Sequence, residues 1–139
     1  MNSLKNILAV GLLAASFSAA TVSAAVKPLA EKYQFDELPE VKGFSNWSIN
    51  GWTAVDRQSL IVRTSPSTAY LLILQRRAPG LRSGNAIALS STASRVHAKF
   101  DTVSTVDRYV SNIPIPIAKI YKLKGKEQRK QVKAQIREG

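Results

Sequence analysis

The sequence of 139 residues contains no cysteine, and this absence excludes three things. Without a thiol the protein has no disulfide bond, no thiol catalysis and no lipid anchor on an N-terminal cysteine. Small exported domains often use disulfides to supplement a small core. The stability of this protein must therefore come from packing or from a partner.

Histidine is nearly absent too, because His97 is the single histidine of the sequence. A serine hydrolase needs a nucleophile, a base and an orienting acid, and the sequence has neither a Gly-x-Ser-x-Gly nor a Ser-x-x-Lys pattern. We interpret His97 as a surface residue of a strand, on the same face as Asp101. A metal ion would need more convergent ligands than these two. The sequence predicts no catalytic residue, no metal and no cofactor.

Acidic residues are also few, which limits the case for a glycosidase built on two carboxylates. Asp56 is better explained as a turn residue whose side chain bonds its own backbone. Asp101 and Asp107 are expected to pair with Lys99 and Arg108. The sequence therefore favours a non-enzymatic role over an enzyme.

The longest apolar run is too short for a membrane anchor, which needs about 20 apolar residues. It spans 7–20, contains Ser16 and Ser18, and follows a start whose one base is Lys5. Small residues follow over 21–25, where a signal peptidase would cut after Ala24 or Ala25.

This pattern predicts a cleaved signal peptide over residues 1–25 and a periplasmic or secreted protein without a transmembrane segment. The whole sequence carries 20 Lys and Arg against 9 Asp and Glu. Cleavage would remove one base, which leaves a net charge of +10. Residues 119–139 alone carry eight bases and two acids, a net charge of +6.

We expect three further parts after the signal: a leader or linker over 26–43, a β domain over 44–124, and a basic tail over 125–139 that is disordered or helical. The leader could hold a short helix that Pro39 ends. The tail has helix-forming composition but few apolar residues, and a short isolated helix is marginal in water.

Short runs of β-type residues fill 44–124. Alternation over 47–56, a run at 60–63 and an apolar run at 69–74 predict three strands, the last two forming a hairpin. The run at 69–74 is apolar on both faces, which is typical of a central strand.

Further strands are expected at 86–90, 96–100 with an extension or successor to 106, and 117–123. Two prolines in Ile113–Ile117 place that segment at a sheet edge or in an extended linker. Six or seven short strands predict a mainly β fold, a small antiparallel barrel or sandwich.

Four stretches carry a family resemblance: 49–62, with its Trp and Asp turn, 69–74, Pro79-Gly80-Leu81-Arg82, and 98–101, with its Phe-Asp pair. Over about residues 44–123 the chain resembles a family of small exported bacterial proteins classed as domain of unknown function 6491. The resemblance implies an envelope location and a small β architecture, and no activity.

The chain departs from this family in its cysteines. Relatives tend to carry one where Ala78 stands here and another near Ser111. The absence of both is consistent with a lost disulfide between two loops, and it rules out redox or metal work by those thiols in this chain.

We expect a non-enzymatic periplasmic module, binding or structural, that contacts an anionic envelope component or an envelope protein. A structural version would add the Ile113–Ile117 edge to another sheet. Export argues against nucleic acid as the partner. An enzyme or small-ligand carrier whose site is not visible in the sequence is the alternative. The expected contacts are basic residues of a loop, a strand face and the tail: Arg76, Arg77, Arg82, Arg95, Lys99, Lys124, Lys126, Arg129, Lys130 and Lys133.

Overall fold

The computed structural model describes residues 29–83, 86–106 and 113–139. The export signal expected over 1–25 lies outside this part of the chain, as do Asp107, Arg108 and Ser111. None of the helices in the described part is long and apolar enough to span a membrane.

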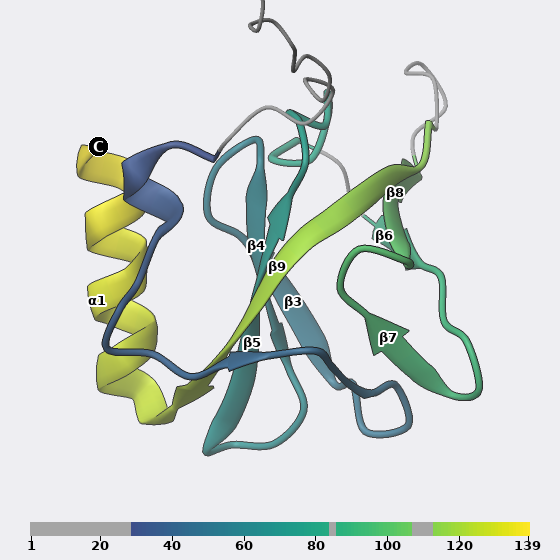
Figure 1. Ribbon diagram of the computed structural model, residues 1–139, viewed down its shortest axis with the longest axis horizontal. Coiled ribbons are helices and arrows are strands. Elements are labelled where there is room, and N and C mark those ends of the chain that lie inside the picture. Colours follow the sequence, from purple (N-terminus) through teal and green to yellow (C-terminus); the bar gives the residue numbers. More distant parts are fainter. Residues whose placement is uncertain (1–28, 84–85, 107–112) are drawn as a thin grey trace, which may run out of the picture.

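Most described elements are strands, and the chain ends in one α-helix (Figure 1). In chain order the elements are η2 (Glu31–Tyr33), β1 (Glu40–Val41), β2 (Gly43–Ser45), β3 (Gly51–Ala54), β4 (Ser59–Arg63), β5 (Thr68–Leu74), β6 (Ala86–Leu89), β7 (Arg95–His97), β8 (Thr102–Val106), β9 (Ile115–Lys124) and α1 (Gly125–Glu138).

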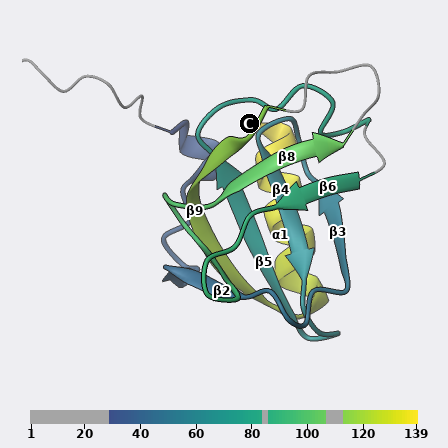
Figure 2. The same cartoon turned by 90° about the vertical axis from the view of Figure 1, so that its right-hand side faces the viewer.

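The strands of the described chain pair antiparallel in the order β3-β4-β5-β9-β8-β6, with β1 beside β9, while β2 and β7 form a separate ribbon. Figure 2 shows how the larger sheet curls, with α1 behind it. The predicted fold class is confirmed: a mainly β protein, here a curled antiparallel half-barrel with a C-terminal helix.

The hairpin predicted from the sequence is present, with β4 and β5 joined by the loop 64–67. β5 also pairs with β9, so it has a neighbour on each side. Leu71 and Ile73 enter one core cluster, and Leu72 and Leu74 enter the other. The prediction of a central strand buried on both faces is confirmed.

The two core clusters occupy the two faces of the sheet. One lies under α1 and η2, and Val132 and Ile136 of the helix are buried in it. The other lies under the β2–β7 ribbon, which contributes Phe44 and Val96. Each face is thus closed by an element from outside the larger sheet.

Residues 29–43 are not a linker, contrary to one of the two readings of 26–43. Tyr33, Phe35 and Leu38 are buried in the cluster under α1. β1 then pairs with β9, which places Glu40 opposite Tyr121. Three apolar side chains within six residues supply the burial that holds this segment on the sheet.

The edge or linker placement expected for Ile113–Ile117 is wrong for residues 115–117, because β9 begins at Ile115 and pairs there with β8. Pro116 uses its carbonyl, which accepts the N–H of Gln75 at 2.9 Å. The neighbouring Ile117 supplies the N–H that bonds the Asp101 carbonyl at 3.0 Å. A proline at the start of a strand therefore fits, since its missing donor is not needed.

The strand expected over 96–100 is shorter than predicted. β7 ends at His97, and the chain turns through Lys99, whose φ of 72° lies in the left-handed region. β8 begins at Thr102. The turn leaves Phe100 on the surface, 82% exposed.

Of the two alternatives for the basic tail, disordered or helical, the structure shows the helix: α1 starts directly after β9. Gly125 makes this junction with a φ of 75°, which favours glycine, and its N–H donates to the Ser67 carbonyl at 2.8 Å. Val132 and Ile136, four residues apart, point to the sheet on one face of the helix. Docking on the sheet is what stabilises so short a helix.

Candidate anion-binding site

Two loops at one end of the half-barrel are joined by a short backbone bond. The N–H of Ala78, after β5, donates to the carbonyl of Arg57, after β3, at 2.8 Å. Ala78-Pro79-Gly80-Leu81 then forms a turn closed by the Leu81 N–H on the Ala78 carbonyl at 3.1 Å, with Gly80 at φ 85°. Proline followed by a left-handed glycine is typical of a type II turn.

The turn places its flanking arginines outward because its own ends are buried. Ala78 is 2% and Leu81 0% exposed. Arg77 and Arg82, the next residues outward along the chain, are both exposed. Burial of the anchors thus fixes which side chains of this loop face solvent.

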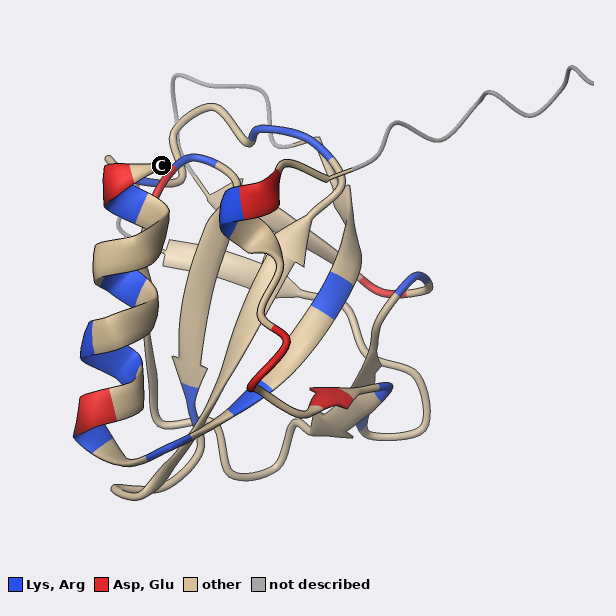
Figure 3. Ribbon diagram, turned by 60° about the vertical axis from the view of Figure 1, so that its left-hand side comes forward, with Lys and Arg blue, Asp and Glu red and all other residues tan. Residues whose placement is uncertain are grey.

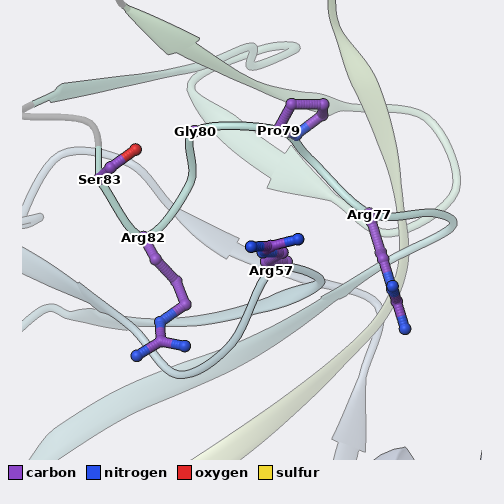
Figure 4. Close-up of a pocket in the computed structure, with 6 residues that line it drawn as sticks. All are labelled: Arg57, Arg77, Pro79, Gly80, Arg82 and Ser83. Carbon is purple, nitrogen blue, oxygen red and sulfur yellow. The ribbon is translucent and has the colours of Figure 1, made fainter.

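Arg57, Arg77 and Arg82 line one open hollow of about 640 Å³, here called the arginine hollow, together with Pro79, Gly80 and Ser83. Figure 4 shows Arg57 between Arg82 and Arg77, with the three guanidinium groups spread out rather than gathered at one point. Arg57 is not among the contacts expected from the sequence, because the neighbouring Asp56 indicated only a turn.

None of the ion pairs among the described residues involves these arginines. The ion pairs among the described residues are Lys32–Asp56 and His97–Asp101. A smaller hollow of about 280 Å³ shares the three arginines and adds Lys32 and Asp56 to its lining. The combined site holds four bases and one acid, and Arg is suited to bind phosphate or carboxylate through two parallel hydrogen bonds.

Asp56 is held by donors on both of its oxygens, so it is a structural residue rather than a free base. One oxygen accepts the Gln58 N–H at 2.8 Å and the Ser59 hydroxyl at 2.7 Å, which confirms the turn prediction. The other accepts the Tyr33 hydroxyl at 2.5 Å and lies 3.2 Å from Lys32 Nζ. Burial alone would raise the pKa of Asp56, but these hydrogen bonds outweigh it and hold the pKa below its usual value.

Replacement of Tyr33 by phenylalanine is expected to lower the free energy of unfolding by about 1–2 kcal/mol at pH 7, because the hydrogen bond to Asp56 is lost. Since the pKa of Asp56 is depressed in the folded state, its contribution is present above the unfolded pKa of about 3.9 and is lost as pH falls through the folded value. Urea unfolding at pH 7 measures the loss of stability in the variant, and the same measurement near pH 3 shows its pH dependence.

Tyr70→Phe is the control, because the Tyr70 ring stacks on Phe44 at 4.5 Å and keeps that packing as phenylalanine. It should change stability by less than about 0.5 kcal/mol. An equal loss in both variants would contradict the assigned role of the Tyr33 hydroxyl.

The remaining predicted contacts are scattered. Arg76 is exposed beside Arg77 but does not line the hollow. Arg95 and Lys99 do not form one strand face, since Lys99 lies in the turn after β7. Lys124 is the last residue of β9, and the other predicted tail residues, Lys126, Arg129, Lys130 and Lys133, all lie on α1.

A third hollow, of about 650 Å³, lies beside the β2–β7 ribbon and is lined in part by His97. The His97 ring nitrogen Nδ1 lies 3.2 Å from Asp101, and the His97 backbone N–H donates to the same oxygen at 2.7 Å. The Ser90 hydroxyl donates to the other oxygen at 2.8 Å. The residues that line this hollow are Glu40, Val41, Lys42, His97, Ala98, Lys99 and Phe100.

The buried Asp101 side chain connects its own segment to Ser90 and to His97 through hydrogen bonds. Burial would raise its pKa, but the hydrogen bonds from Ser90 and from the backbone and ring of His97 outweigh it and lower the pKa. Ser90 donates to Asp101 and not to His97, so the described groups do not form the nucleophile–base bond of a hydrolase. Across the described ranges, no three His, Asp or Glu side chains are placed to share a metal ion.

Comparison with known proteins adds a family and no activity. No curated protein and no solved structure matches this chain. One family model matches residues 2–139, which is nearly the whole sequence and includes the loops that carry the arginine hollow. The chain therefore belongs to the family of unknown function DUF6491.

Proposed function

We propose that the protein is an exported, non-enzymatic binding module that holds the phosphate or carboxylate groups of an anionic envelope component in the arginine hollow. One observation carries the proposal: Arg57, Arg77 and Arg82 line one hollow, and no described carboxylate pairs with them. Charged donors without a protein partner are suited to an anion from outside.

The signal pattern of residues 1–25 supports the envelope as the place of binding. In that compartment the common anions are lipid head groups and acidic polymers. The net charge outside the hollow supports the same class of ligand, since a basic surface raises the local concentration of anions.

Replacement of both Arg77 and Arg82 by glutamine is expected to weaken the binding of inorganic phosphate and of a sugar phosphate at least about tenfold, because charge-assisted hydrogen bonds are lost. Isothermal titration calorimetry measures the affinity, with the unphosphorylated sugar as the ligand control.

The matched control replaces Arg76 and Arg95 by glutamine, which changes the net charge equally but leaves the hollow intact. That variant should bind phosphate within about twofold of the parent. Equal weakening in the two variants would show a general charge effect, and the proposal would fail.

A further inference from the structure

All five cations of α1 lie along one side of the helix. Lys126, Lys130, Lys133 and Arg137 follow the spacing i, i+4, i+7, i+11, and Arg129 lies beside them. At 3.6 residues per turn these five side chains fall within an arc of about 100°. Glu127 and Glu138 fall outside that arc. Figure 3 shows the basic segments along the helix.

Two contacts show which way this cationic stripe faces. Arg129 donates to the carbonyl of Pro66 in the β4–β5 loop, and Arg137 donates to the carbonyl of Val55, both at 3.5 Å. On the other side of the helix, Gln135 donates to the carbonyls of Lys32 and Gln34. The stripe therefore runs beside the hairpin loops, and η2 lies on the opposite flank.

The stripe leads to the arginine hollow. Val55, the carbonyl contact of Arg137, is two residues from Arg57, which lines the hollow. From Lys126 to Arg137 the helix rises about 16 Å. The Arg137 end of the stripe thus meets the chain segment that carries Arg57, and the described ion pairs involve neither the stripe nor the three arginines.

The surroundings of the stripe favour a polymer over a membrane. Among the described residues the exposed large apolar side chains are Trp47, Phe100, Val106 and Ile113, and none is on α1. The β2–β7 ribbon, beside which Trp47 and Phe100 lie, is on the side of the molecule opposite α1 (Figure 1). A helix that lies in a membrane interface needs apolar residues to insert next to its cations.

We propose that the partner is a linear polyanion that lies along the α1 stripe and enters the arginine hollow. This inference rests on the proposed function, since the hollow is one end of the track. The spread of the three guanidinium groups in Figure 4 suits successive charges of a chain better than one small anion.

The test compares phosphate, tripolyphosphate and a polyphosphate long enough to reach from the hollow to Lys126, with polygalacturonate as a carboxylate polymer. The long chains should bind the parent protein at least tenfold more tightly than tripolyphosphate. The double variant Lys130→Gln with Lys133→Gln should bind the long chains about ten- to thirty-fold more weakly than the parent does. Its affinity for phosphate should fall by less than about twofold. The dependence of log affinity on log salt should become shallower by about 1.4.

The control on the same helix is Gln131→Glu with Ala134→Glu, which lowers the net charge by the same amount outside the stripe. The affinity of this control for the long chains should fall by less than about threefold. If a long chain binds no more tightly than tripolyphosphate, the proposed binding along the α1 stripe is wrong, while the proposed anion binding in the arginine hollow still stands. Binding of long chains that is unaffected by Arg77→Gln with Arg82→Gln would overturn both. Tighter binding to anionic vesicles than to either polymer, with the same dependence on the stripe, would overturn the choice of partner.

Discussion

Truncation of Ile136 to alanine is expected to lower the free energy of unfolding by about 2–5 kcal/mol. Ile136 is 1% exposed and packs with Val132 in the cluster that also holds Tyr33 and Leu71. Removal of its outer carbons leaves a cavity between α1 and the sheet. Urea unfolding followed by tryptophan fluorescence, with Trp52 half-buried in the opposite cluster, measures the loss.

Lys130→Ala is the control on the same helix, and it should change stability by less than about 0.5 kcal/mol because Lys130 is exposed. A stability of Ile136→Ala equal to that of the parent would mean that the tail does not dock. The same packing makes deletion of residues 124–139 a poor test of charge. Such a deletion removes the end of β9 and uncovers Leu123 as well as removing the stripe.

Asp101→Asn is expected to lower the free energy of unfolding by about 2–4 kcal/mol at pH 7. The side chain is almost fully buried, and its two oxygens accept hydrogen bonds from Ser90 and from the backbone of His97. Asparagine has the same shape, but its amide nitrogen brings a donor to a place where both neighbours donate, which leaves a buried group unsatisfied. Thermal and urea unfolding measure the loss.

The pH dependence gives this prediction a second readout. The folded pKa of Asp101 is lowered, so its contribution to stability is present above the unfolded pKa of about 3.9 and is lost as pH falls through the folded value. The difference in free energy of unfolding between the parent and Asp101→Asn should therefore decrease below about pH 4. Asp36→Asn, at an exposed carboxylate, should leave stability within about 0.5 kcal/mol. A gap that persists at low pH would show that the charge of Asp101 is not the cause.

The candidate site was predicted in part. The turn residues at 79–80 and their basic neighbours indicated an exposed loop, and Arg77 and Arg82 were among the expected contacts. Arg57 could not be found from the sequence, because it reaches the hollow through a backbone bond to Ala78, which is 21 residues away. A long-range contact of this kind has no local pattern.

The His97–Asp101 pair shows the same limit. Alternation placed both residues on one strand face, but the chain turns at Lys99 and brings them together by folding back. A left-handed turn at a lysine carries little local signal, since glycine and asparagine are the usual residues there. The proximity of His97 and Asp101 was therefore predicted from a shared strand face, whereas a turn produces it.

The sequence by itself determined the β-rich class, the hairpin formed by 60–63 and 69–74, the central strand with two buried faces and the excess of positive charge. These follow from local periodicity and composition, which one chain segment expresses alone. The tertiary structure decided that residues 29–43 join the core, that Pro116 lies within β9, and that the basic tail docks as α1. It also decided that Arg137, at the end of the basic tail, contacts the carbonyl of Val55, two residues from Arg57. Each of these outcomes depends on burial against residues distant in sequence, and that energy is absent from any segment taken alone.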